Sequence, residues 1–166
     1  MTETAHPETT HPETTITADP DLPTIHIVRE FEAAPEAVFR AHTDPELVRR
    51  WLGPRMLTMH IERWDAQTGG AYRYVHTEDD GTAHGFYGSF HEVRPHGRIV
   101  QTFTYAGFPD GVCLETATFE DLGGRTRLHI LSVFETTEGR DAAISSGMES
   151  GVVEGYEQLD ELLARG

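Results

Sequence analysis

The chain has 166 residues, the size of one domain, and its 28 acidic and 13 basic residues give a formal net charge of −15. Such a chain repels phosphate backbones and anionic lipid surfaces, which argues against nucleic-acid and membrane partners. No apolar run approaches the ~18 residues needed to span a bilayer, and no secretion signal is recognisable, so we expect a cytoplasmic protein. The single cysteine, Cys113, excludes an internal disulfide and any zinc site built from several cysteines.

The first 23 residues predict a disordered acidic tail. Proline, threonine and glutamate dominate this segment, and the sequence His-Pro-Glu-Thr-Thr occurs twice in succession, at 6–10 and 11–15. A segment with so few apolar residues cannot offset the entropy lost when it becomes ordered. We therefore place a domain boundary after residue 23 and expect one folded domain over residues 24–166.

Regular patterns begin at Thr24 with an apolar alternation that predicts a strand. Two short helices should follow, one beginning at Pro35 and one capped by Asp44 and ending near Trp51. Six further strand-like runs lie near 57–61, 72–74, 84–93, 98–105, 112–120 and 125–134. The turns between these runs are short, so the strands should form an antiparallel meander.

The last segment changes to a helical period. Apolar residues recur every three or four positions from Met148 to Leu163, which predicts one amphipathic helix over about 138–164. The whole order of elements predicts an α+β fold, in which a curved seven-stranded antiparallel sheet wraps around the C-terminal helix.

Short motifs along the chain resemble a known family. They are Ala34–Ala41, Thr43–Glu46, Arg50–Pro54, Asp65, Gly69-Gly70, Phe86-x-Gly88, Gly124-x-Thr126-x-Leu128, Arg140-Asp141, Gly147-Met148-Glu149-x-Gly151 and Tyr156-x-x-Leu159. Together they resemble the bacterial homologues of the C-terminal domain of the heat-shock-protein-90 ATPase activator, in the START-like, birch-pollen-allergen-like (SRPBCC) superfamily. The resemblance covers about residues 24–164. It implies a helix-grip fold with a cavity between sheet and helix, but it carries no catalytic signature that could be transferred residue by residue.

Aromatic residues are the strongest sign of a ligand in this cavity. Tyr72 and Tyr74 share one strand face, and Phe103 and Tyr105 share another. The alternative is that such rings simply fill the core. The residues that we predict to line the cavity are Trp51, Tyr72, Tyr74, His76, Phe86, Phe103, Tyr105, Glu115, Met148, Gly151 and Tyr156.

Two of these candidates are polar, and one belongs to a glycine stripe. His76 has the strand parity of the two tyrosines, and Glu115 stands among apolar residues of its strand. Gly147, Gly151 and Gly155 recur every four residues, which indicates either close packing of the helix on the sheet or a wider cavity mouth.

Motifs for established chemistries are missing from the sequence. There is no His-Glu-x-x-His zinc motif, no compact cluster of metal ligands, no nucleophile elbow and no phosphate-binding glycine loop. We therefore predict no catalytic residue, metal or cofactor, and regard an enzyme as less favoured than a binding protein.

Three functions remain open after this reading. The first is the binding of a small hydrophobic molecule of lipid, polyketide or aromatic type in the internal cavity. The second is a co-chaperone-like interaction domain that modulates a heat-shock-protein-90 ATPase, with a protein partner or a homodimer. The third is a cyclase or hydrolase of the polyketide-cyclase kind, which the absence of an acid–base constellation weakens.

Overall fold

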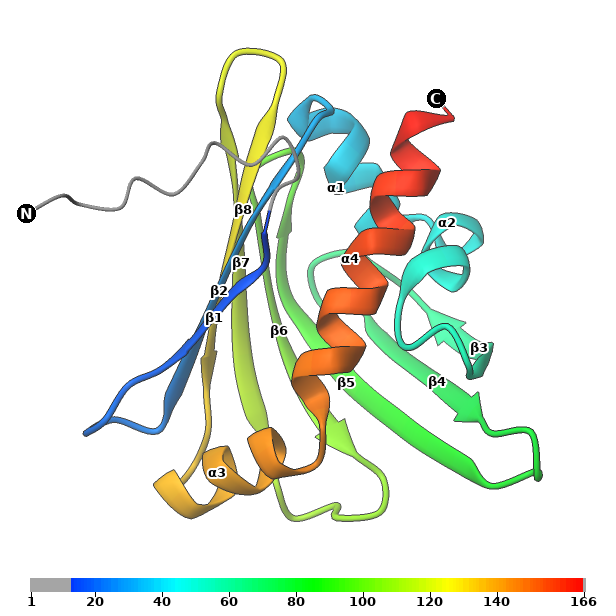
Figure 1. The fold of residues 1–166 in the computed structure, drawn as a ribbon, viewed down its shortest axis with the longest axis vertical. Coiled ribbons are helices and arrows are strands. Elements are labelled where there is room, and N and C mark those ends of the chain that lie inside the picture. Colours follow the sequence, from blue (N-terminus) through cyan, green and yellow to red (C-terminus); the bar gives the residue numbers. More distant parts are fainter. Residues whose placement is uncertain (1–12, 166) are drawn as a thin grey trace, which may run out of the picture.

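Eight antiparallel strands form one curved sheet, and the C-terminal helix lies across one of its faces (Figure 1). The structure is a computed structural model that describes residues 13–165. The strands are β1 (Thr15–Ala18), β2 (Thr24–Phe31), β3 (Thr58–Trp64), β4 (Ala71–Thr77), β5 (Ala83–Arg94), β6 (Arg98–Tyr105), β7 (Cys113–Asp121) and β8 (Thr126–Val133). Their order across the sheet is β1-β2-β8-β7-β6-β5-β4-β3. Consecutive strands from β3 to β8 therefore pair with one another, as do β1 and β2, and β2 also pairs with β8.

The described residues also form four helices: α1 (Pro35–Thr43), α2 (Pro45–Trp51), α3 (Thr137–Ser145) and α4 (Met148–Ala164). The Asp44 side chain accepts a hydrogen bond from the backbone N–H of Glu46 at 3.0 Å, which is the predicted cap of α2. The α+β helix-grip fold is confirmed, with eight strands instead of the predicted seven. Within residues 13–165, none of the helices combines the length and the apolar composition needed to cross a membrane.

The additional strand, β1, lies inside the segment predicted to be disordered. It pairs with β2, with Thr15 opposite Val28 and Ala18 opposite Ile25. The prediction of a disordered tail is therefore wrong for residues 15–23, and its part over residues 1–12 lies outside the described residues. Composition misleads here because β2 offers a free sheet edge, whose N–H and C=O groups can order a short polar segment.

A buried arginine also fixes the connection between β1 and β2. Arg140 of α3 is only 4% exposed, and its Nη1 donates hydrogen bonds of 2.8 to 3.0 Å to three backbone oxygens. The acceptors are the carbonyls of Asp19, Leu22 and Thr24. The turn after β1 is thus tied to a residue more than a hundred positions later in the chain, which no local pattern indicates.

The predicted single helix over 138–164 is two helices. α3 ends at Ser145 and α4 begins at Met148, and Gly147 between them has a φ of +90°. That left-handed conformation is open to glycine and strained for other residues, so the helix is interrupted there. The apolar period does not reveal the break, because residues on both sides of it keep a helical spacing.

The core is packed tightly at one end of the sheet. Phe31 makes an edge-on contact with the ring of Tyr156 at a centroid distance of 5.4 Å, and Trp51 stacks on the same ring at 5.9 Å. Leu128 of β8 and Leu159 of α4 are completely buried in the same cluster. At the opposite end of α4, Met148 and Val152 are only half-buried, so the interior is less tightly filled there.

The glycine stripe of α4 packs against the segment that follows α2, and the predicted contact with the sheet is wrong. A methyl group at Gly155 would lie 3.2 Å from the carbonyl oxygen of Trp51 and 3.3 Å from the nitrogen of Gly53. At Gly151 it would meet only Pro54, at 3.5 Å. Gly147 precedes the helix and takes no part in the stripe.

Two alanine substitutions test this packing. Gly151→Ala is expected to stabilise the protein by about 0.5–1 kcal/mol, because alanine favours the helix and Pro54 leaves room for it. Gly155→Ala is expected to destabilise it by about 1–2 kcal/mol, because backbone atoms of the α2–β3 segment must move. Urea denaturation measures both, and equal stabilisation by the two variants would contradict the close approach at Gly155.

Candidate functional site

A row of aromatic rings covers the inner face of β4, β5 and β6, the face toward α4. Tyr72 and Tyr74 stack with an interplanar angle of 18°. Phe86, opposite Tyr74 in the ladder, stacks on Tyr74 at 5.3 Å and on Phe103 at 5.5 Å. Because side chains alternate along a strand, these four predicted residues share one side of the sheet and form a continuous aromatic surface.

The acid at the centre of this face is Glu115. It lies on β7, opposite Gln101 of β6 on one side and Ser132 of β8 on the other. The Ser132 hydroxyl donates to its Oε2 at 3.4 Å, and among residues 13–165 no basic side chain forms an ion pair with it. Burial raises the pKa of the Glu115 carboxyl from its ordinary value of 4.5 to about 7.

Three tyrosines, Tyr72, Tyr74 and Tyr156, are buried in the same interior. Burial, and after it the charge of Glu115, raises the pKa of Tyr72 and Tyr74 on β4 and that of Tyr156 on α4. The interior between α4 and the sheet thus contains one acid, Glu115, and three buried tyrosines.

Two of these phenols have no protein partner among the described residues. The Tyr72 hydroxyl donates to the carbonyl of Thr102 at 2.7 Å and accepts from Gln101 at 3.2 Å. Tyr74 and Tyr156 are 5% and 4% exposed, yet neither hydroxyl makes a hydrogen bond there. The side-chain atoms that lack both a partner and access to water belong to Thr24, His42, Trp64 and Arg98. The hydroxyls of Tyr74 and Tyr156 therefore reach a space that admits water.

Other inward-facing side chains border the same space. Gln101, Phe103, Glu115, Ala117 and Ile130 belong to the centre of the sheet and face α4, and all are only half-buried. In a tightly packed interior such central residues would be closed off from solvent. Solvent therefore reaches part of the inner face between the sheet and the first half of α4.

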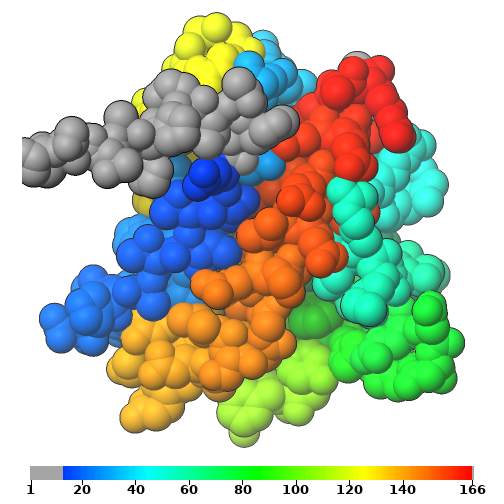
Figure 2. Space-filling model, in the orientation of Figure 1, coloured from blue at the N-terminus to red at the C-terminus, as the bar shows by residue number. Residues whose placement is uncertain are grey.

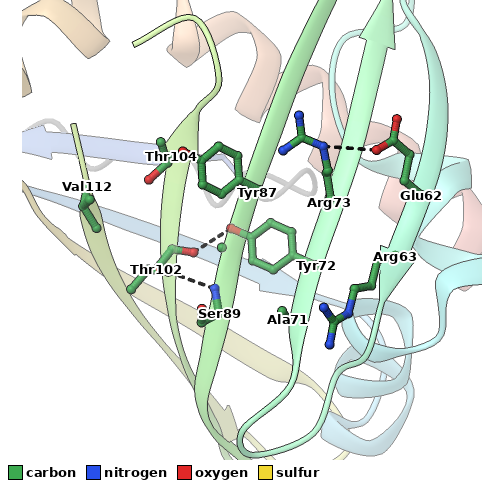
Figure 3. A pocket seen from close by; sticks show the side chains of 11 residues that line it. Glu62, Arg63, Ala71, Tyr72, Arg73, Tyr87, Ser89, Thr102, Thr104 and Val112 are labelled. Atoms are coloured by element: carbon green, nitrogen blue, oxygen red, sulfur yellow. Dashed lines mark hydrogen bonds and ion pairs between the residues drawn. The ribbon is translucent and has the colours of Figure 1, made fainter. Parts of the chain in front are cut away.

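The outer face of the sheet carries a separate hollow of about 610 Å³ (Figure 3). Arg73, Tyr87 and Thr104 line it, and Arg73 pairs with Glu62 at 3.1 Å. Tyr72 belongs both to this lining and to the aromatic row. Its ring lies against Gly88, where a Cβ atom would overlap the Thr102 carbonyl oxygen, so only glycine leaves room there. A second hollow, of about 460 Å³, lies between α2 and β3.

Three of the predicted lining residues are engaged with the helices. Trp51 is buried, and its Nε1 donates to the carbonyl of Ala41 at 2.8 Å. His76 does lie on the inner face, but its Nε2 is 3.3 Å from the carbonyl of Leu52, and burial lowers its pKa. Gly151 faces Pro54. Trp51 and Gly151 therefore serve packing between helices, and His76 closes one end of the aromatic row.

Tyr105 and Met148 lie at the rim of the enclosed space. Tyr105 is 42% exposed and contacts the ring of Phe86, while Met148 is the half-buried first residue of α4. Figure 2 shows a recess between the orange first turns of α4 and the green and yellow-green atoms of the strands beside it. We take this recess as the opening of the enclosed space.

Residues that the sequence reading missed complete the site. The ring of Trp64 on β3 lies 5.1 Å from the ring of Tyr72, and the ring of Phe90 on β5 lies 5.3 Å from it, measured between ring centroids. A β-bulge between Ile61 and Arg63 shifts the alternation of β3 by one residue. Simple parity from Ile61 therefore assigns Trp64 to the wrong face.

Comparison with known proteins places this architecture in a family. The model of the family described as "Activator of Hsp90 ATPase homolog 1-like protein" matches residues 32–164. The chain belongs to this family. No curated protein matches the sequence.

Solved structures of bacterial proteins share the fold over most of the chain. A crystal structure from Rhodobacter sphaeroides is 29% identical, with a TM-score of 0.85 over 93% of this chain and 100% of that one. A solution structure from Arthrobacter aurescens is 28% identical, with a TM-score of 0.84 over 92% of each chain. The AHSA1 protein of Silicibacter pomeroyi, 23% identical over 85% of this chain and 97% of that one, has the same fold with a TM-score of 0.71.

Proposed function

We propose that the protein binds a small, largely apolar molecule between α4 and the inner face of the sheet. The observation that carries the proposal is a set of inward-facing polar groups that have few protein partners and lie in an aromatic interior. These groups are the Glu115 carboxyl and the hydroxyls of Tyr74 and Tyr156. A few placed polar groups in an apolar enclosure are typical of small-molecule sites.

The competing explanation, that the rings only fill a core, accounts poorly for these groups. A buried polar group without a hydrogen bond costs about 1–3 kcal/mol, so proteins rarely keep such groups unless water or a ligand satisfies them. The half-buried Ala117 and Ile130 further indicate that side chains do not fill the centre of the interior.

Binding of a neutral, environment-sensitive dye such as N-phenyl-1-naphthylamine tests the proposal. We expect saturable fluorescence enhancement with a micromolar dissociation constant, because apolar burial contributes ~25 cal/mol per Å². Ala117→Phe places a ring in the enclosed space and should weaken binding at least about tenfold. Its neighbour Thr118 is exposed on the other face of β7, so Thr118→Phe is the matched control and should leave the affinity unchanged. Dye affinity that is equal in the two variants would refute an internal site.

A second candidate function is an interaction with a protein partner, the heat-shock-protein-90 ATPase that the family description names. Three exposed apolar side chains near the β6–β7 connection favour it: Phe108, Val112 and Leu114 are 64%, 41% and 44% exposed. Under this alternative, the purified protein should stimulate the ATPase, and Phe108→Ser should abolish the stimulation without changing dye binding.

A further inference from the structure

We propose that the hollow on the outer face of the sheet binds a small organic carboxylate with an apolar body, held by Arg63, Arg73 and Thr104. This site is separate from the proposed internal one, because the hollow lies on the face of the sheet that points away from α4 (Figure 3). Its volume of about 610 Å³ is typical of small-molecule sites.

The β-bulge in β3 brings two arginines together at this hollow. Arg63 lies directly opposite Arg73 in the pairing of β3 with β4, and the bulge adds Glu62 beside them. All three side chains line the hollow. Like charges directly opposite each other in a sheet are unfavourable, and one carboxylate compensates only one of the two guanidinium groups. The lining therefore carries one excess positive charge, in a chain whose net charge is −15.

Most N–H donors of the two guanidinium groups have no protein partner. Arg73 contacts Glu62 through its Nε at 3.1 Å, and its guanidinium lies 5.2 Å from the centroid of the Tyr87 ring. These two contacts hold the Arg73 side chain over the hollow. No described residue accepts a hydrogen bond from its Nη groups, and Arg63 forms no ion pair within residues 13–165. A carboxylate, with two acceptor oxygens in one plane, matches the fork of such a guanidinium group.

A buried hydroxyl also opens into the hollow. Thr104 lies opposite Tyr87 in the pairing of β5 with β6, lines the hollow and is only 4% exposed. Its hydroxyl makes no hydrogen bond to a described residue, yet it is not among the side-chain atoms that are closed off from water. Thr102 adds a second hydroxyl, which accepts a hydrogen bond from the Ser89 N–H at 2.9 Å and can still donate its own proton. An anion in the hollow would satisfy both hydroxyls.

Charge and lining together select the class of ligand. One excess positive charge suits a monoanion, whereas a phosphate dianion would lose the hydration of a second charge that finds no partner. An amine cation would meet guanidinium groups of its own sign. Tyr87 and the exposed Val112 offer apolar surface, so an apolar body on the carboxylate adds affinity. The net charge of the protein repels anions at long range, so we expect a dissociation constant of about 0.1–1 mM.

Titration calorimetry with 2-naphthoate at pH 7.5 tests the inference. Arg63→Gln and Arg73→Gln should each weaken binding at least about fivefold, because each removes a charged hydrogen-bond donor from the hollow. Arg50, an exposed arginine of α2 that does not line the hollow, provides the matched control. Arg50→Gln makes the same change in net charge and should leave the affinity unchanged.

Two further variants test the hollow itself. Ala71 lines it opposite Ser89 of β5, so Ala71→Leu keeps both arginines but occupies their shared space and should weaken binding at least about tenfold. Thr104→Val keeps the shape of the side chain without its hydroxyl and should weaken binding about threefold. Far-UV circular dichroism verifies that each variant folds.

The outcomes separate this inference from the proposed function. Weaker 2-naphthoate binding in the Arg63, Arg73 and Ala71 variants, with unchanged binding of the neutral dye, would support the outer site. Binding that Ala117→Phe weakens and the arginine variants do not would place the anion in the interior and overturn the inference. Equal losses in Arg63→Gln and Arg50→Gln would overturn it as well, because net charge alone would then be responsible. No binding of 2-naphthoate up to roughly 5 mM would overturn the outer site and leave the internal site standing.

Discussion

Asp160→Ala is expected to destabilise the fold by about 3 kcal/mol, because it leaves a buried guanidinium without its countercharge. Arg29 points inward from β2 and is 3% exposed, and its Nη2 lies 2.6 Å from Asp160 on α4. Its remaining contacts include the Glu30 carbonyl at 2.8 Å and the ring of Phe31, neither of which carries a charge. Loss of one partner of a buried pair costs about 3–5 kcal/mol, and we expect the lower value because Asp160 is 38% exposed.

The next residue of the same helix provides the control. Glu161 pairs with Arg55 at 2.7 Å, but both side chains are about half exposed, at 52% and 46%. Glu161→Ala should therefore cost less than about 1 kcal/mol. Urea denaturation measures both variants. Equal losses would show that water screens the Arg29–Asp160 pair as well, and that it does not anchor α4 to β2.

Glu115→Gln is expected to stabilise the ligand-free protein at alkaline pH by up to about 3 kcal/mol. The pKa of this carboxyl is about 7 in the folded protein and near 4.5 when it is exposed. The unfolded chain therefore releases its proton at lower pH than the folded protein, and the wild type loses stability as the pH rises from about 4.5 to about 7. At 1.36 kcal/mol for each pH unit this loss amounts to about 3 kcal/mol, and glutamine does not ionise.

The test is the difference in unfolding free energy between variant and wild type as a function of pH. It should be near zero at pH 4.5, grow through neutrality and remain constant above about pH 8. Glu120→Gln, which replaces an exposed acid that pairs with Arg127, should show no such rise. A Glu115→Gln protein that is less stable than the wild type at pH 8 would mean that the carboxylate has a favourable internal partner.

Much of the fold was predictable from neighbouring residues in the chain. The Asp44-Pro45 pair marks the start of α2, and the apolar alternations mark the strands, because capping and side-chain parity act over a few residues. The same parity correctly groups Tyr72 with Tyr74 on one strand face. Caps and side-chain parity depend on the backbone geometry of a few neighbouring residues, so they can be predicted from each segment by itself.

The candidate site was predictable only in part. The sequence indicates Glu115 and the tyrosines by residue type and strand parity, but the lack of a basic partner for Glu115 within residues 13–165 depends on what β6 and β8 place beside it. The burial that raises the pKa of Glu115 depends on residues from several segments, so neighbouring residues in the sequence do not predict this pKa. Tyr156 shows the same dependence, because its ring meets Phe31 of β2 and Trp51 of α2 only when α4 lies across the sheet.

Three features depend on contacts between distant segments. β1 is ordered by the edge of β2 and by Arg140, and its own composition favours disorder. Trp64 faces inward because a bulge in the β3–β4 pairing shifts its parity, and a bulge is a property of two strands. Local patterns therefore account for which elements form and which way most side chains point. The added strand, the shifted tryptophan and the uncompensated acid arise from packing, because edge pairing, register and desolvation exist only between segments that folding brings together.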